Sequence, residues 1–180
     1  MLKKTIIPVL AAVLALSSVA TAADRKGDFA LGFSTSDAPV GVRYFTSDKL
    51  ALDLGLGFES TDLGESSASS FFLEGGVTFV LYDYESSFFF VRPAVGYQSL
   101  DNRIYGTGVG DAKWSVLTIG LNLGAEVRLA ERFGLTFQHG LRYSSTSVPD
   151  EVQADVGADK FTDFSTFGEN VTEAGVWFTF

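Results

Sequence analysis

Large apolar residues recur at every second position along most of the chain. Leu52, Leu54 and Leu56 alternate with Asp53 and Gly55, and the same alternation returns in other segments. A two-residue period is that of a β-strand with one apolar and one polar face, and no segment keeps a helical period. The pattern predicts eight strands, at about residues 28–34, 39–45, 50–59, 71–83, 88–99, 115–129, 133–144 and 171–180.

The connections between these segments alternate in length. Short links suited to tight turns lie at 46–49, 84–87 and 130–132, with another at 35–38, whereas longer links rich in Ser, Gly and Asp lie at 60–70, 100–114 and 145–170. An even number of antiparallel strands, with short turns at one end and longer loops at the other, is typical of membrane barrels. Several strands reach the roughly nine to eleven residues that a tilted strand needs to cross a bilayer. We therefore predict an all-β fold, an eight-stranded antiparallel transmembrane up-and-down β-barrel.

A soluble ligand-binding barrel has the same number of strands, but its large apolar residues point inward. The polar face of this chain carries many glycines, among them Gly41, Gly76 and Gly140. Glycine weakens a solvent-exposed strand, whereas inside a narrow barrel it leaves room for long side chains. This favours lipid outside and a lumen filled by an ionic network of the charged residues on the polar face: Arg43, Asp53, Glu74, Arg92, Glu126, Arg142 and Glu173.

The end of the chain carries a short motif. Glu173, Gly175, Phe178 and Phe180 supply a polar residue, a glycine and two aromatic residues at fixed spacing, and the last aromatic residue ends the sequence. This resembles the terminal strand of bacterial outer-membrane β-barrels, which the barrel-assembly machinery recognises as an assembly signal.

The chain after residue 22 resembles, in architecture, the small eight-stranded outer-membrane proteins of the A and X type, a porin-like family of Gram-negative cell envelopes. The resemblance implies location in the bacterial outer membrane, with outer-membrane lipid and lipopolysaccharide as neighbours. It also implies periplasmic tight turns and external longer loops.

Residues 1–22 have the features of a secretory signal peptide. Lys3 and Lys4 precede a largely apolar stretch, and Ala20, Thr21 and Ala22 supply the small residues that a signal peptidase accepts. We therefore expect residues 1–22 to be removed and residues 23–180 to form the outer-membrane barrel.

The composition narrows the chemistry. The absence of Cys excludes disulfides, cysteine-ligated metal sites and thiol nucleophiles. The formal charge of −9, from 13 basic and 22 acidic residues, disfavours binding to nucleic acid, because neutralising phosphates requires a basic surface. We expect no cofactor, no dedicated metal site and a monomer.

The lumen sets the expected function. Eight strands enclose an interior just wide enough to be filled by side chains. We therefore expect a plugged lumen and a structural or surface-interaction role of the adhesin type, with a gated, narrow solute or ion pore as the alternative.

Any external ligand is expected at the longer loops. Residues 145–170 hold six acidic residues against Lys160, interleaved with Phe161, Phe164 and Phe167. Divalent cations are one candidate ligand, since Ca²⁺ favours several oxygen ligands, although the spacing matches no defined calcium loop.

The one histidine raises an enzymatic alternative. His139 lies on the apolar face between Phe137 and Leu141, where an ionisable group is unusual. Lipid A deacylases of the outer membrane resemble this chain in architecture and place a catalytic His on the lipid-facing side, with a Ser nucleophile two residues later. Leu141 occupies that position here. We therefore expect the protein not to be an enzyme.

Overall fold

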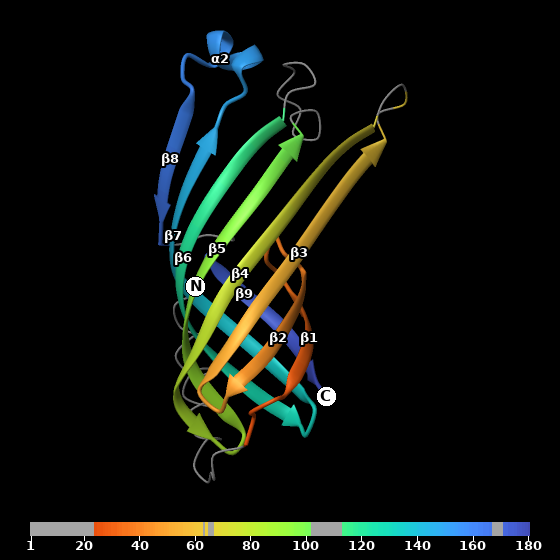
Figure 1. Ribbon diagram of the computed structural model, residues 1–180, viewed down its shortest axis with the longest axis vertical. Helices are drawn as coiled ribbons and strands as arrows, with labels where there is room; N and C mark the ends of the chain where they lie inside the picture. The colour runs from red at the N-terminus through yellow and green to blue at the C-terminus, as the bar shows by residue number, and fades with distance from the viewer. Residues whose placement is uncertain (1–23, 63, 65–66, 102–112, 167–170) are drawn as a thin grey trace, which may run out of the picture.

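The computed structural model describes residues 24–62, 64, 67–101, 113–166 and 171–180, so the predicted signal peptide lies outside its described part. None of the described residues belongs to a helix long and apolar enough to cross a membrane. The described elements are strands and one short helix (Figure 1). In chain order they are β1 (Phe29–Ser34), β2 (Val40–Ser47), β3 (Leu50–Asp62), β4 (Ser67–Tyr84), β5 (Ser87–Asp101), β6 (Lys113–Ala130), β7 (Phe133–Ser147), α2 (Asp150–Val156), β8 (Lys160–Ser165) and β9 (Thr172–Thr179).

The strands form a closed antiparallel barrel. Each strand from β1 to β7 pairs with the next one, β7 also pairs with β9, and β9 pairs with β1. The prediction of an eight-stranded antiparallel barrel is therefore confirmed. The three predicted tight turns join β2 to β3, β4 to β5 and β6 to β7 at what we term the lower end, at the bottom of Figure 1.

The eighth strand of the barrel is interrupted. Both β8 and β9 pair with β7, β8 with its upper part and β9 with its lower part. His139 pairs with Thr172 of β9, and Arg142 pairs with Ser165 of β8. The two β7 residues are three positions apart in the sequence, whereas their partners are seven positions apart. The eighth strand therefore carries four extra residues. The prediction of one continuous link over residues 145–170 was wrong, because α2 and β8 form within it.

Several strands run further upward than predicted. β3 continues to Asp62 and β4 begins at Ser67, both inside the predicted link 60–70. The residues there are Ser, Thr and Asp on β3 and Ser and Ala on β4. The alternation of large apolar and polar residues that identifies a strand is therefore missing from these parts. β5 likewise extends upward to Asp101, and β6 already begins at Lys113.

The barrel wall has unequal height. β1 and β2 have 6 and 8 residues, whereas β3 to β7 have 13 to 18. In Figure 1 the link between β1 and β2 lies well below the upper ends of β3 to β8. The lower part is therefore a closed ring, and among the described residues the upper part is a sheet that is open on the side of β1 and β2.

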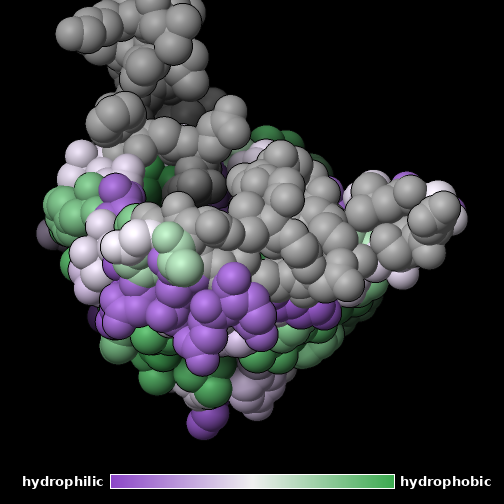
Figure 2. Space-filling view, turned by 90° about the horizontal axis from the view of Figure 1, so that it is seen from above, coloured by the Kyte–Doolittle hydropathy of each residue, from purple (hydrophilic) through white to green (hydrophobic). Residues whose placement is uncertain are grey.

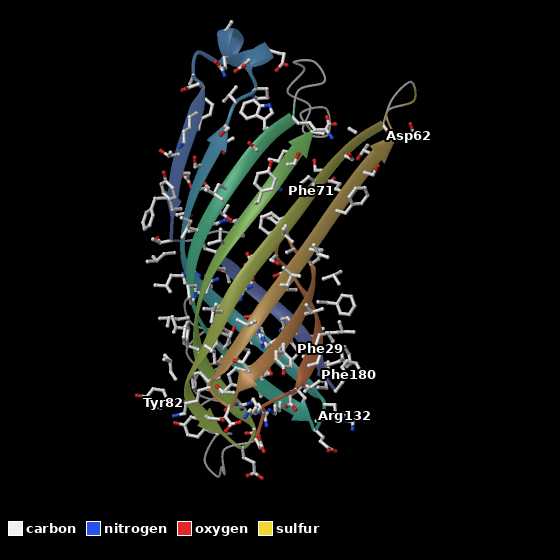
Figure 3. All side chains as sticks on the ribbon, in the orientation of Figure 1. Phe29, Asp62, Phe71, Tyr82, Arg132 and Phe180 are labelled. Atoms are coloured by element: carbon white, nitrogen blue, oxygen red, sulfur yellow. The ribbon has the colours of Figure 1, made fainter. Side chains whose placement is uncertain are left out.

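The large apolar residues face outward, as predicted. Leu52, Leu54 and Leu56 on β3, and Leu121 and Leu123 on β6, are exposed, whereas the intervening charged and small residues point inward. Phe29 and Phe180 lie together on the outside near the lower end, and Phe71 lies outside near the upper end (Figure 3). Viewed from above, hydrophilic residues form a band at the upper end, with hydrophobic residues on the flank beside it (Figure 2).

Not all apolar residues face outward. Phe45, Phe88 and Phe90 are buried with Ala51 and Val80 in one cluster inside the lower part of the barrel. The rings of Phe45 and Phe88 meet edge to face, with centroids 6.3 Å apart. The lower part of the lumen thus contains an apolar cluster, which lies below the charged residues in its middle.

Candidate functional site

Arg43 joins strands that are far apart in the sequence. Its Nε donates to Asp53 Oδ1 at 2.5 Å, and its Nη1 donates to Glu126 Oε2 at 2.7 Å. Asp53 is the direct cross-strand partner of Arg43, whereas Glu126 lies 83 residues away on β6. Thr136 Oγ1 also donates to Glu126 at 3.0 Å. Arg43 is only 3% exposed, so its charge is compensated by these two carboxylates rather than by bulk water.

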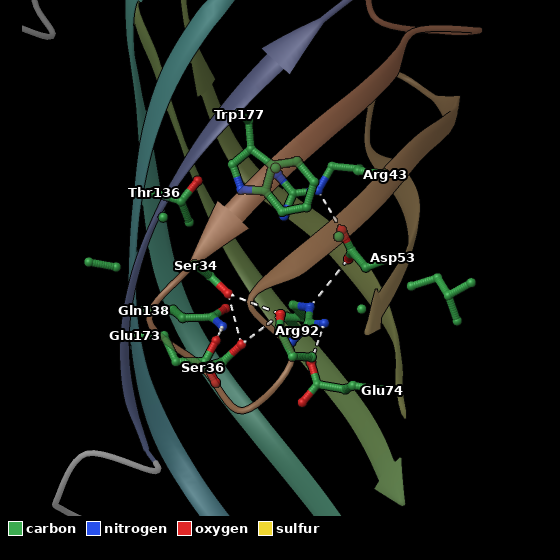
Figure 4. Close-up of a pocket in the computed structure, with 17 residues that line it drawn as sticks. Ser34, Ser36, Arg43, Asp53, Glu74, Arg92, Thr136, Gln138, Glu173 and Trp177 are labelled. Atoms are coloured by element: carbon green, nitrogen blue, oxygen red, sulfur yellow. Dashed lines mark hydrogen bonds and ion pairs between the residues drawn. The ribbon is translucent and has the colours of Figure 1, made fainter. Parts of the chain in front are cut away.

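Arg92 continues the network from Asp53 to Glu74 (Figure 4). Its Nη2 donates to Glu74 Oε1 at 2.6 Å, and its Nε donates to Asp53 Oδ2 at 3.3 Å. Thr78 Oγ1 donates to the same Asp53 oxygen at 2.6 Å. A Cβ at Gly76 would lie 2.9 Å from the guanidinium carbon of Arg92, so this glycine makes room for the arginine.

Trp177 completes the centre of the lumen. The guanidinium carbon of Arg43 lies 4.2 Å from the centroid of its ring, a cation–π arrangement. A Cβ at Gly32 would come within 2.5 Å of the indole, so glycine is required opposite it. The sequence analysis missed Trp177 because the terminal motif leaves that position open. Trp177 could have been found from the alternation, because it lies on the same face of the strand as Glu173 and Gly175.

The other two predicted lumen residues lie outside this set of ion pairs, although Glu173 lines the same cavity as Arg43 and Arg92. Arg142 Nη2 pairs with Asp37 Oδ2 at 3.3 Å, and Gln138 Nε2 donates to Glu173 Oε2. The structure therefore gathers five of the seven residues into one set of ion pairs and gives Arg142 and Glu173 other partners.

The partner of Arg142 lies on the link between β1 and β2. This link folds inward over the lumen and lies directly against Gly57 of β3. The approach is so close that a Cβ at Gly57 would come within 1.9 Å of the carbonyl oxygen of Asp37. A Cβ at Gly55 would come within 2.8 Å of Ala38. The two glycines of β3 therefore accept the link, and the Asp37–Arg142 pair holds it against β7.

A further buried arginine lies at the lower end. Arg25 is 2% exposed and forms two hydrogen bonds to Asp83, of 2.7 and 2.5 Å. Its guanidinium carbon lies 4.4 Å from the centroid of Phe88, and its backbone N–H donates to Asp48 Oδ1. The sequence analysis missed Arg25 because it precedes the first predicted strand.

The cavities of the lumen are small at its centre. About 40 Å³ is open among Arg43, Arg92 and Trp177, room for only a few water molecules. About 310 Å³ opens at the lower mouth, beside Arg128 and Asp28. Burial raises the pKa of the Asp28 carboxyl, while Arg128 and Arg25 act in the opposite direction.

His139 lies on the outer face, as predicted, and has a partner. Its Nδ1 lies 2.7 Å from Thr172 Oγ1, directly across the β7–β9 pair. This hydrogen bond satisfies one ring nitrogen of a polar side chain on an otherwise apolar face. Thr172 could not be found from the sequence, because the interruption of the eighth strand sets its register.

The acidic residues of 145–170 do not gather in one element. Asp150 and Glu151 lie in the first turn of α2, and Asp163 lies on β8. Within the described ranges, no group of His, Cys, Asp and Glu is arranged to hold a metal ion. Glu169 lies outside the described residues.

Comparison with known proteins gives one similar structure. No protein-family model matches the chain, and no curated protein sequence matches it. The fold is similar to that of the N-terminal β-barrel domain of Pseudomonas aeruginosa OprF, with a TM-score of 0.45 and 14% identity over 88% of this chain and 100% of that one.

Proposed function

We propose that this chain is a bacterial outer-membrane β-barrel with a structural and surface-interaction role. The observation that carries the proposal is the direction of its side chains. The outer surface of the closed ring is covered by exposed leucines and phenylalanines, which water would not favour but hydrocarbon would. A soluble barrel would place these residues in its core.

The lumen supports a plug rather than an open channel. Its middle is occupied by Arg43, Arg92 and their carboxylates, and its floor by Phe45, Phe88 and Phe90. Moving an ion through would separate buried ion pairs, which costs several kcal/mol for each uncompensated charge. The tight turns then face the periplasm and the taller sheet faces the exterior.

The location is tested by fractionation and heat-modifiable migration. We expect the protein in the outer-membrane fraction, with unboiled samples migrating differently from boiled ones on a gel. A soluble protein whose migration does not depend on boiling would overturn the proposal.

The plug is tested by recordings in planar bilayers. We expect no reproducible conductance from the wild-type protein. A reproducible conductance that is lost on Arg92→Met or Glu126→Gln would show that the charged lumen is an ion path, and would replace the plug with a narrow pore.

We also propose that Glu173, Gly175, Phe178 and Phe180 act as the signal for the barrel-assembly machinery. Support comes from their place on and directly after β9, the strand that closes the barrel against β1. Phe180→Ala should lower the amount of assembled barrel in cells but leave refolding in detergent unchanged. Phe137→Ala, a change at a similarly exposed outer residue outside the motif, is the matched control.

The proposal includes no enzymatic activity. The contact between His139 and Thr172 lacks a described acidic residue that would orient the imidazole, and a hydroxyl paired with a lone imidazole is a weak nucleophile. We expect the same lipid A acyl pattern in cells with and without the protein. A changed pattern that His139→Ala restores would overturn this conclusion.

A further inference from the structure

The largest of the described cavities opens at the lower mouth of the lumen. Its volume of about 310 Å³ reaches the size of pockets that hold small ligands, about 300–1,000 Å³. Charged residues line it from the segment before β1, from the end of β6 and from the turn before β7: Asp24, Arg25, Asp28, Glu126, Arg128, Glu131 and Arg132. The cavity therefore offers both signs of charge to a ligand.

Two of these charged residues already have partners. Arg25 pairs with Asp83, and Glu126 pairs with Arg43. Within the described part of the chain, the others form no side-chain hydrogen bond and no ion pair: Asp24, Asp28, Arg128, Glu131 and Arg132. Two guanidinium groups and three carboxylates are therefore free to meet a ligand in this cavity.

Arg128 supplies a site for an anionic group. It lies opposite Gly134 in the β6–β7 pair, on the same inward-facing side of β6 as Glu126. It is half-buried, whereas Arg132 in the following turn is exposed. A guanidinium group has five N–H donors and binds a phosphate through two parallel hydrogen bonds. A half-buried guanidinium without a protein partner, with a second one beside the same cavity, favours a phosphate group here.

The cavity reaches the lipid-facing side of the barrel. Phe133 and Phe180 line it, and the ring of Phe133 contacts that of Phe178 on the outer face, with centroids 5.1 Å apart. Figure 3 shows Phe29 and Phe180 on the outside of the barrel, with Arg132 below them at the lower end. Apolar rings above and guanidinium groups below follow the order of acyl chains and headgroup in the lower leaflet of a bilayer.

The free carboxylates decide which headgroup fits. A headgroup with only negative charge would meet Asp24, Asp28 and Glu131 unfavourably. A primary ammonium donates up to three charge-assisted hydrogen bonds to carboxylates, whereas a quaternary ammonium has no N–H to donate. The lining therefore favours a phosphate that is joined to a primary ammonium.

We propose that the lower mouth binds one phosphatidylethanolamine molecule, with its phosphate on Arg128 and its ammonium on Asp24 and Asp28. Its acyl chains lie on the outer rings of Phe29 and Phe180. This deepens the structural role of the barrel and rests on the proposed function, because a barrel in the outer membrane has the periplasmic leaflet at its lower end.

The test is native mass spectrometry of the refolded full barrel, released from detergent micelles that contain three phospholipids in equal amounts. The probes are phosphatidylethanolamine, phosphatidylcholine and phosphatidylglycerol with the same acyl chains. We expect one phosphatidylethanolamine molecule to be retained at least about threefold more than either other lipid. Soluble glycerophosphoethanolamine, which carries the headgroup without acyl chains, should not displace it at equal concentration, since it gains nothing from the outer rings.

Variants of the cavity separate the two halves of the headgroup. Arg128→Gln should lower retention of phosphatidylethanolamine about threefold to tenfold, the range for loss of a partly exposed ion pair. It should keep heat-modifiable migration, because Arg128 has no ion-pair partner in the described chain to lose. The double variant Asp24→Asn/Asp28→Asn should bring the retention of phosphatidylethanolamine and phosphatidylcholine within about twofold of each other.

The other two lower turns supply matched controls. Lys49 lies in the turn between β2 and β3, and Glu85 lies in the turn between β4 and β5; both are exposed, and neither lines the cavity. Lys49→Gln and Glu85→Gln should each change retention by less than about twofold.

Several results would overturn the inference. These are equal retention of the three lipids, retention that Arg128→Gln leaves unchanged, control variants that lose as much as the cavity variants, or displacement by the soluble headgroup. A barrel that reaches the outer membrane but shows no lipid preference rejects this inference alone. Absence from the outer membrane rejects the proposed function.

Discussion

Replacing Arg43 by Met tests whether the lumen is a dry, paired network. Methionine keeps roughly the length of the side chain but removes the charge and all donors. Arg43 is 3% exposed and bridges Asp53 and Glu126 at 2.5 and 2.7 Å. It also lies over Trp177 at 4.2 Å. The substitution should therefore leave buried carboxylates that have lost a counter-charge.

The two carboxylates are affected unequally. Asp53 keeps Arg92 at 3.3 Å and Thr78 at 2.6 Å, so it retains a positive partner. Glu126 keeps the Thr136 hydroxyl at 3.0 Å. Leaving one buried charge without its partner costs about 3–5 kcal/mol of unfolding free energy, and loss of the cation–π contact adds about 1 kcal/mol. Most of the loss should come from Glu126.

The assay is denaturant unfolding of the refolded barrel in phosphatidylcholine vesicles, followed by tryptophan fluorescence. Arg43→Met should lower the unfolding free energy by about 3–5 kcal/mol. The double variant Arg43→Met/Glu126→Gln should be more stable than Arg43→Met alone, because it removes the stranded charge. A loss below about 1 kcal/mol, or a double variant less stable than the single one, would mean that water solvates Glu126 and that the plug argument is wrong.

Two further changes probe the packing of the interior. Gly76→Ala should destabilise the barrel by about 1–3 kcal/mol, because the new methyl group would displace the Arg92 guanidinium 2.9 Å away, whereas Gly75→Ala, with nothing within 4 Å, should change unfolding by less than about 0.5 kcal/mol. If the two variants unfold alike, the close fit around Arg92 is refuted. Arg25→Ala should lower the unfolding free energy by about 2–4 kcal/mol through loss of its paired hydrogen bonds to Asp83, measured by the same assay, and Arg25→Lys should recover only part of it. A fully stable Arg25→Ala variant would show that these hydrogen bonds do not stabilise the lower end.

The alternation of residues was sufficient to predict the strands, whereas the direction of their two faces was predicted from the glycines on the polar face and from the terminal motif. Leu52 and Leu54 alternate with Asp53 because one face meets an apolar phase, and this local signal does not depend on which strands pair. The inward position of Arg43 followed from the same parity. Strand ends were predicted less well where both faces are polar, as in β3 from Ser60 to Asp62.

The partners within the site could not be predicted in the same way. The pair of Arg43 and Glu126 depends on how strands 83 residues apart face each other across the closed ring. Arg25 lies before the first strand, so no alternation marks it as an interior residue. The contact of His139 with Thr172 depends on the four extra residues in the eighth strand. No pattern in the sequence marks where these extra residues are inserted.

The uneven height of the wall has a consequence for the surrounding lipid. On β4 the outward apolar residues extend from Phe71 to Leu81, whereas on β1 they extend only from Phe29 to Phe33. A bilayer of uniform thickness cannot match both sides, and such mismatch is relieved by tilting of the protein or by local thinning. We expect the barrel to lean in the membrane, with shortened and less ordered acyl chains along the flank of β1 and β2.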